Sequence, residues 1–336
     1  MSKKMNVCIV GDGGWGTALG MLLLSAGHHV TVWGPFEDYL ADVRASGENS
    51  RYLAGVKLPS ALNWTSDVNA AVSTANLVVL ATPSHFYGDV CKKFAGHIPA
   101  DADVVSVAKG FCEETRERLT QTAAAILVLK CVAALSGPSH AEEVSREIPT
   151  AVVIASNDFE QAQRLQAIFT GPRFRVYTST DTIGVELGGA VKNVLALAVG
   201  MSDGLGFGDN SRAALITRGL SEMARLGAAM GGQPETFAGL SGIGDLVVTC
   251  TSRHSRNRSV GERLGRGETL EMIQAGMKQV AEGVWNCRIV VQLAKEQGIE
   301  MPICETVHAV LAGEMTAFDA VSMLMGRDSK HETYGV

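Results

Sequence analysis

Apolar residues in the first half of the chain form short continuous runs, separated by stretches with helical periodicity. The runs are rich in β-branched residues and lie at 6–10, 29–33, 77–81, 103–108, 131–136, 151–155 and 174–177. Between them, apolar residues recur every three to four positions, as at 17–25 and 159–169. Continuously apolar strands are covered on both faces, and their alternation with helices is typical of βαβ units. The pattern predicts an open, mostly parallel, doubly wound sheet.

From about residue 181 onward the strand signals nearly vanish. Helix-like stretches follow at 184–201, 211–230, 256–265, 269–275, 286–297 and 302–312, and we expect the polar tail to fray. Ser, Thr and Asp at 178–183 are suited to cap the first of these helices. We therefore predict an α/β domain over 1–180 and a mainly α-helical domain over 181–336.

A glycine motif follows the first predicted strand and opens the first predicted helix. Gly11, Gly13 and Gly16 form G-x-G-x-x-G. In a strand–turn–helix context the first glycine allows a tight turn, the second lets a pyrophosphate approach the backbone, and the third lets the helix pack on the strand. The helix N-terminus adds unpaired N–H groups and a positive dipole end. The motif indicates a Rossmann-type domain that binds NAD or NADP.

The end of the second strand normally distinguishes the two cofactors, through an acidic residue or an arginine. Here it is followed by Gly34 and Pro35, so neither selector is present. Glu37 and Asp38 either reach the ribose or only begin a helix. We therefore expect both NADH and NADPH to be accepted.

Composition excludes several classes of protein. The 336 residues carry a net charge of −6 and are 46% apolar, so the chain has material for a core and no basic excess to drive nucleic-acid binding. No apolar run reaches about 18 residues, and the N-terminus does not resemble a signal peptide. The seven cysteines lack zinc-ligand spacing, so we expect no metal site and a reducing, cytoplasmic location.

Two polar positions in the first predicted domain follow strands, where ligands of open α/β sheets bind. Lys109 follows the run at 103–108, with a surface lysine as the alternative. Ser139 lies in the segment SGPSHA after the run at 131–136. It is suited to bind ligand oxygens, although an ordinary helix cap explains it equally well.

Three further groups of polar residues lie in the second half. Lys192 stands beside an asparagine in an otherwise apolar helical stretch, with Gly188 and Gly189 one turn earlier leaving room for a ligand. Ser255 and Arg256 open a predicted helix in a basic, hydroxyl-rich segment, which is the best phosphate site outside the glycine loop. Glu282 lies in an apolar setting and either touches the nicotinamide ribose or pairs with Arg256.

In order along the chain, these segments resemble the bacterial-type NAD(P)-dependent sn-glycerol-3-phosphate dehydrogenases. The matching segments span residues 11 to 303: GDGGWGTAL, RYLAGVKLP, AKGF, SGPSHA, GVELGGAVKNVLALAVG, NSRAALITRGLSEMARLG, GLSGIGDLVVTCTSRHSRNRSVG, VAEGV and MPI. The resemblance implies a Rossmann domain followed by a helical domain. It also implies reversible reduction of dihydroxyacetone phosphate to glycerol 3-phosphate for glycerophospholipid synthesis.

The resemblance also implies the roles of individual residues. Lys192 is then the general acid/base; the substrate is held by Lys109, Gly137, Ser139, Lys192, Asp245, Ser255, Arg256 and Asn257. The cofactor is touched by Gly14, Trp15, Lys109, Ala141, Arg256, Val280 and Glu282, in addition to the glycine motif. The chain departs from the family pattern in two places: Gly14 stands where the family usually has Ser, and Gly34 and Pro35 stand where it is often basic.

Two other functions stay open. One is a related two-domain 3-hydroxyacid or 6-phosphogluconate-type dehydrogenase, and the other is a non-catalytic dinucleotide sensor. We expect a phosphorylated small-molecule substrate, and no nucleic-acid partner and no membrane span. The sequence does not give the oligomeric state, and a homodimer stays open beside a monomer.

Overall fold

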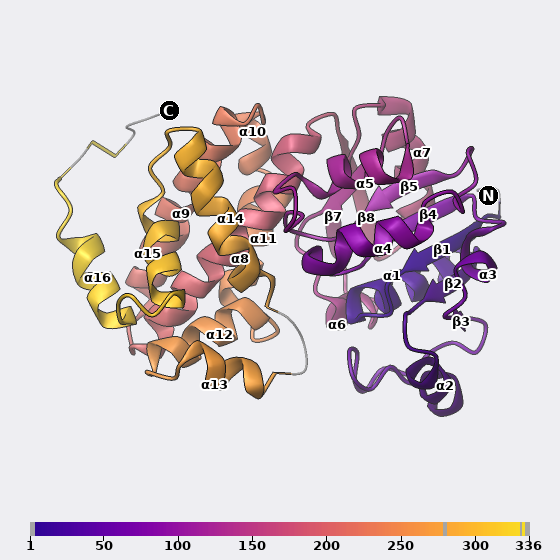
Figure 1. The fold of residues 1–336 in the computed structure, drawn as a ribbon, viewed down its shortest axis with the longest axis horizontal. Helices are drawn as coiled ribbons and strands as arrows, with labels where there is room; N and C mark the ends of the chain where they lie inside the picture. The colour runs from indigo at the N-terminus through magenta and orange to yellow at the C-terminus, as the bar shows by residue number, and fades with distance from the viewer. Residues whose placement is uncertain (1–3, 278–280, 330, 333–336) are drawn as a thin grey trace. The chain divides into compact units, whose positions relative to one another are not determined.

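The computed structural model describes residues 4–277, 281–329, 331 and 332. The chain divides into two compact units, Met1–Thr182 and Ile183–Val336. The first is an α/β unit and the second is helical (Figure 1).

The first unit contains an eight-stranded sheet with the strand order β3-β2-β1-β4-β5-β6-β7-β8. Among the described strand pairs only β6 with β7 is antiparallel, so the mostly parallel sheet expected from the sequence is confirmed. The prediction missed the edge strand β3, which has only three residues. The strands are β1 (Asn6–Val10), β2 (His29–Trp33), β3 (Asn63–Thr65), β4 (Leu77–Leu80), β5 (Asp103–Ser106), β6 (Ala133–Ser136), β7 (Thr150–Ala155) and β8 (Phe174–Ser179).

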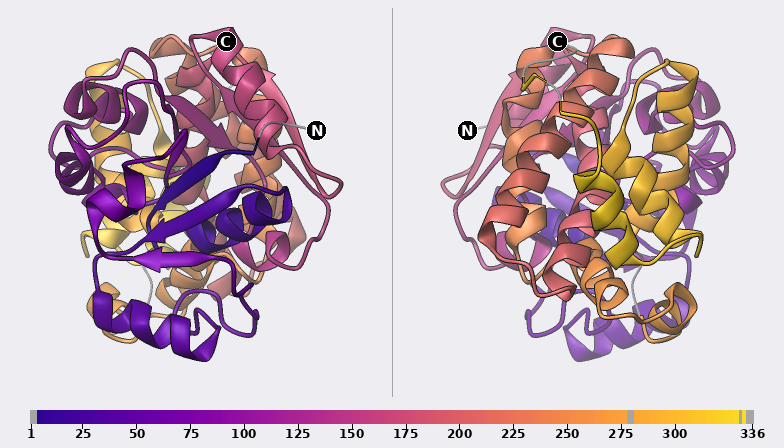
Figure 2. Two further views of the ribbon diagram at one scale, coloured as in Figure 1. Left: turned by 90° about the vertical axis from the view of Figure 1, so that its right-hand side faces the viewer. Right: turned by 90° about the vertical axis from the view of Figure 1, so that its left-hand side faces the viewer.

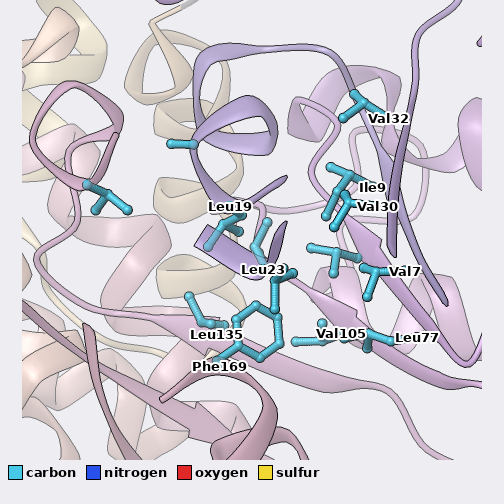
Figure 3. Close-up of a cluster of buried hydrophobic side chains, with 14 of the residues drawn as sticks. Val7, Ile9, Leu19, Leu23, Val30, Val32, Leu77, Val105, Leu135 and Phe169 are labelled. Carbon is cyan, nitrogen blue, oxygen red and sulfur yellow. The ribbon is translucent and has the colours of Figure 1, made fainter. Parts of the chain in front are cut away.

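Helices cover both faces of this sheet. They are α1 (Gly14–Ser25), α2 (Glu37–Ser46), α3 (Val68–Val72), the 3₁₀ turn η1 (Ser84–Phe86), α4 (Tyr87–Phe94), α5 (Leu119–Leu127), α6 (Ala141–Val144) and α7 (Phe159–Phe169). Successive strand residues point to opposite faces, so β1 contributes to two cores. Val7 and Ile9 pack with α1 and α7, whereas Cys8 and Val10 pack with α4 and α5 (Figure 3 shows the first cluster). Both faces of the sheet are therefore packed against helices, and the ends of the strands anchor the loops that follow them.

The second unit is built of helices (Figure 2, right). They are α8 (Thr182–Gly204), α9 (Asp209–Ala229), α10 (Pro234–Phe237), the π-helical turn η2 (Leu240–Gly244), α11 (Asp245–Thr251), α12 (Arg256–Gly265), α13 (Leu270–Ala275), α14 (Glu282–Glu296), α15 (Pro302–Leu311) and α16 (Ala317–Met325). The mainly helical second domain is confirmed, although the sequence reading did not anticipate α16. Helix α8 is long and apolar enough to cross a membrane, but 89% of its most apolar window is buried, as in the core helix of a globular protein.

Glycines let neighbouring backbones approach α8 closely. A Cβ at Gly188 would overlap the carbonyl oxygen of Ser241, and one at Gly200 would overlap that of Arg258. A Cβ at Gly261 would in turn overlap the carbonyl oxygen of Leu197. The sequence interpretation that Gly188 leaves room for a ligand is therefore wrong, because the backbone of η2 fills that space. This close packing positions η2 and α11 against the helix that carries Lys192.

Candidate functional site

The glycine loop between β1 and α1 has the tight geometry expected of its motif. Gly11 has a φ of +129°, and a Cβ there would lie 2.8 Å from the Ala81 carbonyl oxygen. A Cβ at Gly16 would overlap the Gly11 carbonyl oxygen. Both positions thus require glycine, one for the turn and the other for the packing of α1 on β1.

A buried asparagine fixes this loop from outside the motif. The Asn49 side-chain amide donates to the Asp12 carbonyl oxygen and to Thr17 Oγ1, both at 2.8 Å. Thr17 Oγ1 in turn donates to the Gly13 carbonyl oxygen at 2.9 Å. Asn49 is fully buried, so the loop is held in one conformation before any ligand binds.

Two features of the loop fit a dinucleotide. Gly13, the N-cap of α1, makes no side-chain cap and has open space where a Cβ would be, so an anion can approach the helix N-terminus. The buried indole Nε1 of Trp15 has no hydrogen-bond partner among the described residues. A buried donor without a partner is rare and is suited to a ligand acceptor. Gly11, Gly13, Trp15 and Gly16 would therefore hold the cofactor.

The departure at position 14 has a steric reason. A Cβ at Gly14 would lie 2.5 Å from the Tyr52 carbonyl oxygen, and that backbone cannot yield as a flexible side chain would. A serine at position 14, which is usual in the family, thus does not fit beside the backbone of Tyr52 in this conformation. Gly14 can contribute its backbone N–H to a phosphate but no side-chain contact.

Glu37 begins α2 rather than standing free for a ribose. Its carboxylate accepts from the Arg44 guanidinium and, at 2.7 Å, from Ser66 Oγ. Those hydrogen bonds lower the pKa of Glu37. Of the two interpretations given to this residue, the structure favours the helix start.

The polar residues after β5 and β6 meet at one carbonyl group. Lys109 Nζ donates to the Gly137 carbonyl oxygen at 3.0 Å, and Ser139 Oγ donates to the same oxygen at 2.9 Å. Gly137 has a φ of +131°, which turns the chain sharply after β6. Ala141, the first residue of α6, has its Cβ 3.7 Å from the position of a Cβ at Gly14. The structure thus brings Lys109, Gly137 and Ser139 together and places Ala141 beside the glycine loop.

In the second unit, Lys192 is buried on α8 and forms an ion pair with the first residue of α11. Its Nζ lies 2.6 Å from Asp245 Oδ1 and 2.7 Å from Thr249 Oγ1. Lys192 is 5% exposed and Asp245 is 1% exposed. Thr249 Oγ1 also donates to the Asp245 carbonyl oxygen at 2.6 Å, which fixes the hydroxyl lone pair toward the ammonium. A buried, charge-balanced ammonium of this kind can stabilise an oxyanion and donate a proton.

Hydrogen bonds between amide groups beside Lys192 link the helices α8, α12 and α14. Asn257 Nδ2 of α12 donates to Asn193 Oδ1 at 2.9 Å, and Asn257 Oδ1 accepts from the Gly283 backbone N–H of α14 at 2.8 Å. Both ends of the Asn257 side chain are therefore engaged within the protein. The group of Asn257 suited to an anion is its backbone N–H, in the first turn of α12.

The start of α12 carries the N-cap residue Ser255 and, directly after it, the exposed guanidinium of Arg256. Ser255 is the N-cap, and its Oγ accepts from the Arg258 backbone N–H at 3.2 Å. Arg258 pairs with Asp203 at 2.7 Å, and Asp203 also pairs with Arg212 at 2.9 Å. Arg256 is exposed and makes no ion pair with any residue that the structure describes. Of the two arginines at the start of α12, Arg256 is therefore the one suited to bind a phosphate.

Of the predicted cofactor contacts Glu282 and Val280, the structure describes Glu282. Glu282 is the first residue of α14, and its backbone carbonyl accepts from Asn286 Nδ2 at 2.9 Å. The pairing of Glu282 with Arg256 that the sequence left open is not seen. Val280, predicted to touch the cofactor, lies outside the described residues.

The sequence reasoning assigned no individual role to two polar residues, Asn49 and Thr249. Both act on groups distant in the chain, so spacing alone carried no signal for their roles. Asn49 does lie two positions before the segment RYLAGVKLP that contributed to the resemblance. Within the described part of the chain, no cluster of His, Cys, Asp and Glu could hold a metal ion.

Comparison with known proteins covers both units. The family model described as NAD-dependent glycerol-3-phosphate dehydrogenase N-terminus matches residues 6–162, and that described as the C-terminus matches 181–322. A glycerol-3-phosphate dehydrogenase [NAD(P)+] of Moorella thermoacetica is 49% identical over 98% of each chain. The same enzyme of Geobacter sulfurreducens is 47% identical over 99% of this chain and 100% of its own.

A solved structure agrees with these relatives. Glycerol-3-phosphate dehydrogenase from Coxiella burnetii is 40% identical and superimposes with a TM-score of 0.93, covering 96% of this chain and 99% of its own. The family models, the sequence relatives and this structure all extend over nearly the whole chain. The chain therefore belongs to the NAD-dependent glycerol-3-phosphate dehydrogenase family.

Proposed function

We propose that this chain catalyses the reversible, NAD(P)-linked reduction of dihydroxyacetone phosphate to sn-glycerol 3-phosphate, which supplies glycerophospholipid synthesis. The observation that carries the proposal is the buried ammonium of Lys192 on α8, held by Asp245 and Thr249 of α11. It occurs in a chain that matches both family models. A purely structural dinucleotide sensor has no need for a buried lysine of this kind.

Lys192 is the general acid/base of this proposal. The bound nicotinamide cofactor supplies the hydride that reduces the carbonyl carbon. Lys192 meets the negative charge that grows on the carbonyl oxygen and donates the proton that completes the alcohol. In the reverse direction it accepts that proton. Asp245 balances the ammonium in the resting site, and Thr249 fixes the position of Nζ.

The substrate phosphate binds at the start of α12. Arg256 offers a forked guanidinium, and the first-turn N–H groups and the helix dipole add to it. Ser255 and Asn257 shape this site, since the Ser255 side chain caps the turn and the Asn257 side chain ties it to α8 and α14. Binding the phosphate fixes the ketone in one orientation, which lowers the entropic part of the barrier.

The remaining predicted residues complete the proposal. Lys109, Gly137 and Ser139 bind the substrate from the ends of β5 and β6, and Lys109 also contacts the cofactor. Ala141 and Glu282 contact the cofactor, and Gly14 does so through its backbone. Each of these assignments stays a prediction for this chain.

One assay separates this function from its alternatives. The purified protein is incubated with NADH or NADPH and either dihydroxyacetone phosphate, a 3-oxoacid or no acceptor, and nicotinamide absorbance is followed. A second arm offers 6-phosphogluconate with NAD⁺ or NADP⁺. We expect turnover only with dihydroxyacetone phosphate. Oxidation of NADH by the 3-oxoacid alone would favour the hydroxyacid enzyme, and dinucleotide binding without any turnover would favour the sensor.

Location and assembly are further proposals. All seven cysteines are free and six are buried, which suits a reducing compartment such as the cytoplasm. Cell fractionation tests this. A homodimer stays a proposal beside the monomer, and light scattering would distinguish them because a dimer has twice the 35.5 kDa mass of one chain.

A further inference from the structure

A carboxylate occupies the end of β2, although the sequence has glycine there. In Rossmann folds an acidic side chain about 20 residues after the glycine motif binds the adenosine ribose hydroxyls. Gly34 holds that place in this chain. A Cβ on Gly34 would lie 2.6 Å from Asp12 Oδ2 and 2.7 Å from Asp12 Cγ. The side chain of Asp12, the second residue of the glycine motif, therefore fills the space that a side chain at position 34 would take.

This carboxylate is incompletely satisfied in the protein. Asp12 Oδ2 is buried and has no hydrogen-bond partner among the described residues. Burial raises the pKa of Asp12, whereas its own backbone N–H and the Arg51 guanidinium act in the opposite direction. A buried acceptor without a donor is rare in folded proteins and calls for one from a ligand.

Arg51, the cation near Asp12, does not take the place of its carboxylate in choosing between NADH and NADPH. Arg51 is exposed, and its guanidinium carbon lies 4.7 Å from the centre of the Tyr39 ring and 5.9 Å from that of Tyr52. Solvent and salt screen an exposed charge of this kind more than the partly buried carboxylate. The side chain at the end of β2 itself is therefore the Asp12 carboxyl, and not a cation.

We propose that Asp12 makes this enzyme select NADH over NADPH. Its carboxylate accepts hydrogen bonds from the ribose hydroxyls, and its charge repels a 2′-phosphate. Asp12 is thus a specificity-determining residue supplied by the glycine loop in place of the strand end. The inference rests on the dinucleotide site of the proposed function and narrows the expectation that both cofactors are accepted.

The test is the ratio of the NADPH and NADH dissociation constants, measured by fluorescence titration without substrate. We expect the wild-type protein to bind NADH at least tenfold more tightly. Asp12→Asn keeps the side-chain shape but removes its charge, and should reduce the ratio at least fivefold. Asp42→Asn removes an exposed carboxylate of α2 and should leave the ratio unchanged.

Two results would overturn the proposal: equal or tighter NADPH binding by the wild-type protein, or an unchanged ratio in a folded Asp12→Asn variant. The wild-type ratio can overturn the proposal even if the variant does not fold. ADP-ribose and its 2′-phosphate, used as competitors, should show the same preference. Because the readout is binding, it is independent of whether dihydroxyacetone phosphate is turned over.

Discussion

Replacing Lys192 by alanine should nearly abolish turnover. General acid catalysis contributes about 10²- to 10⁴-fold, and stabilisation of the developing oxyanion adds to it. We therefore expect kcat for dihydroxyacetone phosphate to fall at least a thousandfold. Lys192→Arg should be nearly as poor, because a guanidinium keeps the charge but does not release a proton near neutral pH.

The same substitution should also destabilise the second unit. Asp245 is 1% exposed, and alanine at position 192 would leave its carboxylate buried without its cation. Breaking a buried ion pair on one side costs about 3–5 kcal/mol. For a unit of this size that lowers Tm by roughly 6–20 °C. The double variant Lys192→Ala/Asp245→Ala removes both charges and should recover much of this stability without recovering activity.

The experiment separates chemistry from folding. kcat is measured well below the Tm of each variant, and NADH affinity is measured by fluorescence. Lys295→Ala, an exposed lysine near the end of α14, is the matched control and should behave as the wild type. If folded Lys192→Ala retains more than about a tenth of wild-type kcat, Lys192 is not the acid, and Lys109 becomes the leading candidate.

Three further outcomes are expected. Arg256→Ala should raise KM for dihydroxyacetone phosphate roughly 10- to 100-fold, because a charge-assisted hydrogen bond to the phosphate is lost, and should raise KM for unphosphorylated dihydroxyacetone far less. Arg266→Ala at the other end of α12 is the control. Equal losses for both ketones would contradict the phosphate role. Gly188→Ala should lower the free energy of unfolding by about 1–3 kcal/mol in urea titrations, because the added methyl overlaps a backbone carbonyl, whereas Gly208→Ala has open space. Burial raises the pKa of Glu222 to about 7 from 4.5, so the folded protein binds more protons between these values. The free energy of unfolding should then fall by up to about 3 kcal/mol from pH 4.5 to 7, and Glu222→Gln should lack that slope.

The sequence determined those features that depend on neighbours in the chain. Strands such as β1 and β4 are continuous apolar runs, and only a sheet covered on both faces accommodates them. The glycine loop follows from backbone sterics that any strand–turn–helix of this kind must satisfy. A lysine in an apolar helical stretch is costly unless it has a partner, so Lys192 was identifiable as exceptional before that partner was known.

Only the tertiary structure decided which distant residues meet. Asp245 and Thr249 lie 53 and 57 positions after Lys192, and no spacing rule links them. Gly188 was misread, because a glycine that admits a neighbouring backbone and one that admits a ligand look the same in sequence. The short edge strand β3 carries too little apolar pattern to be seen. Asp12 lies in the motif, yet its contact with Gly34 arises because β1 and β2 are paired in the sheet, so their loops are adjacent. Local pattern is set by covalent neighbours, whereas electrostatic partners and packing contacts are set by how the elements pack.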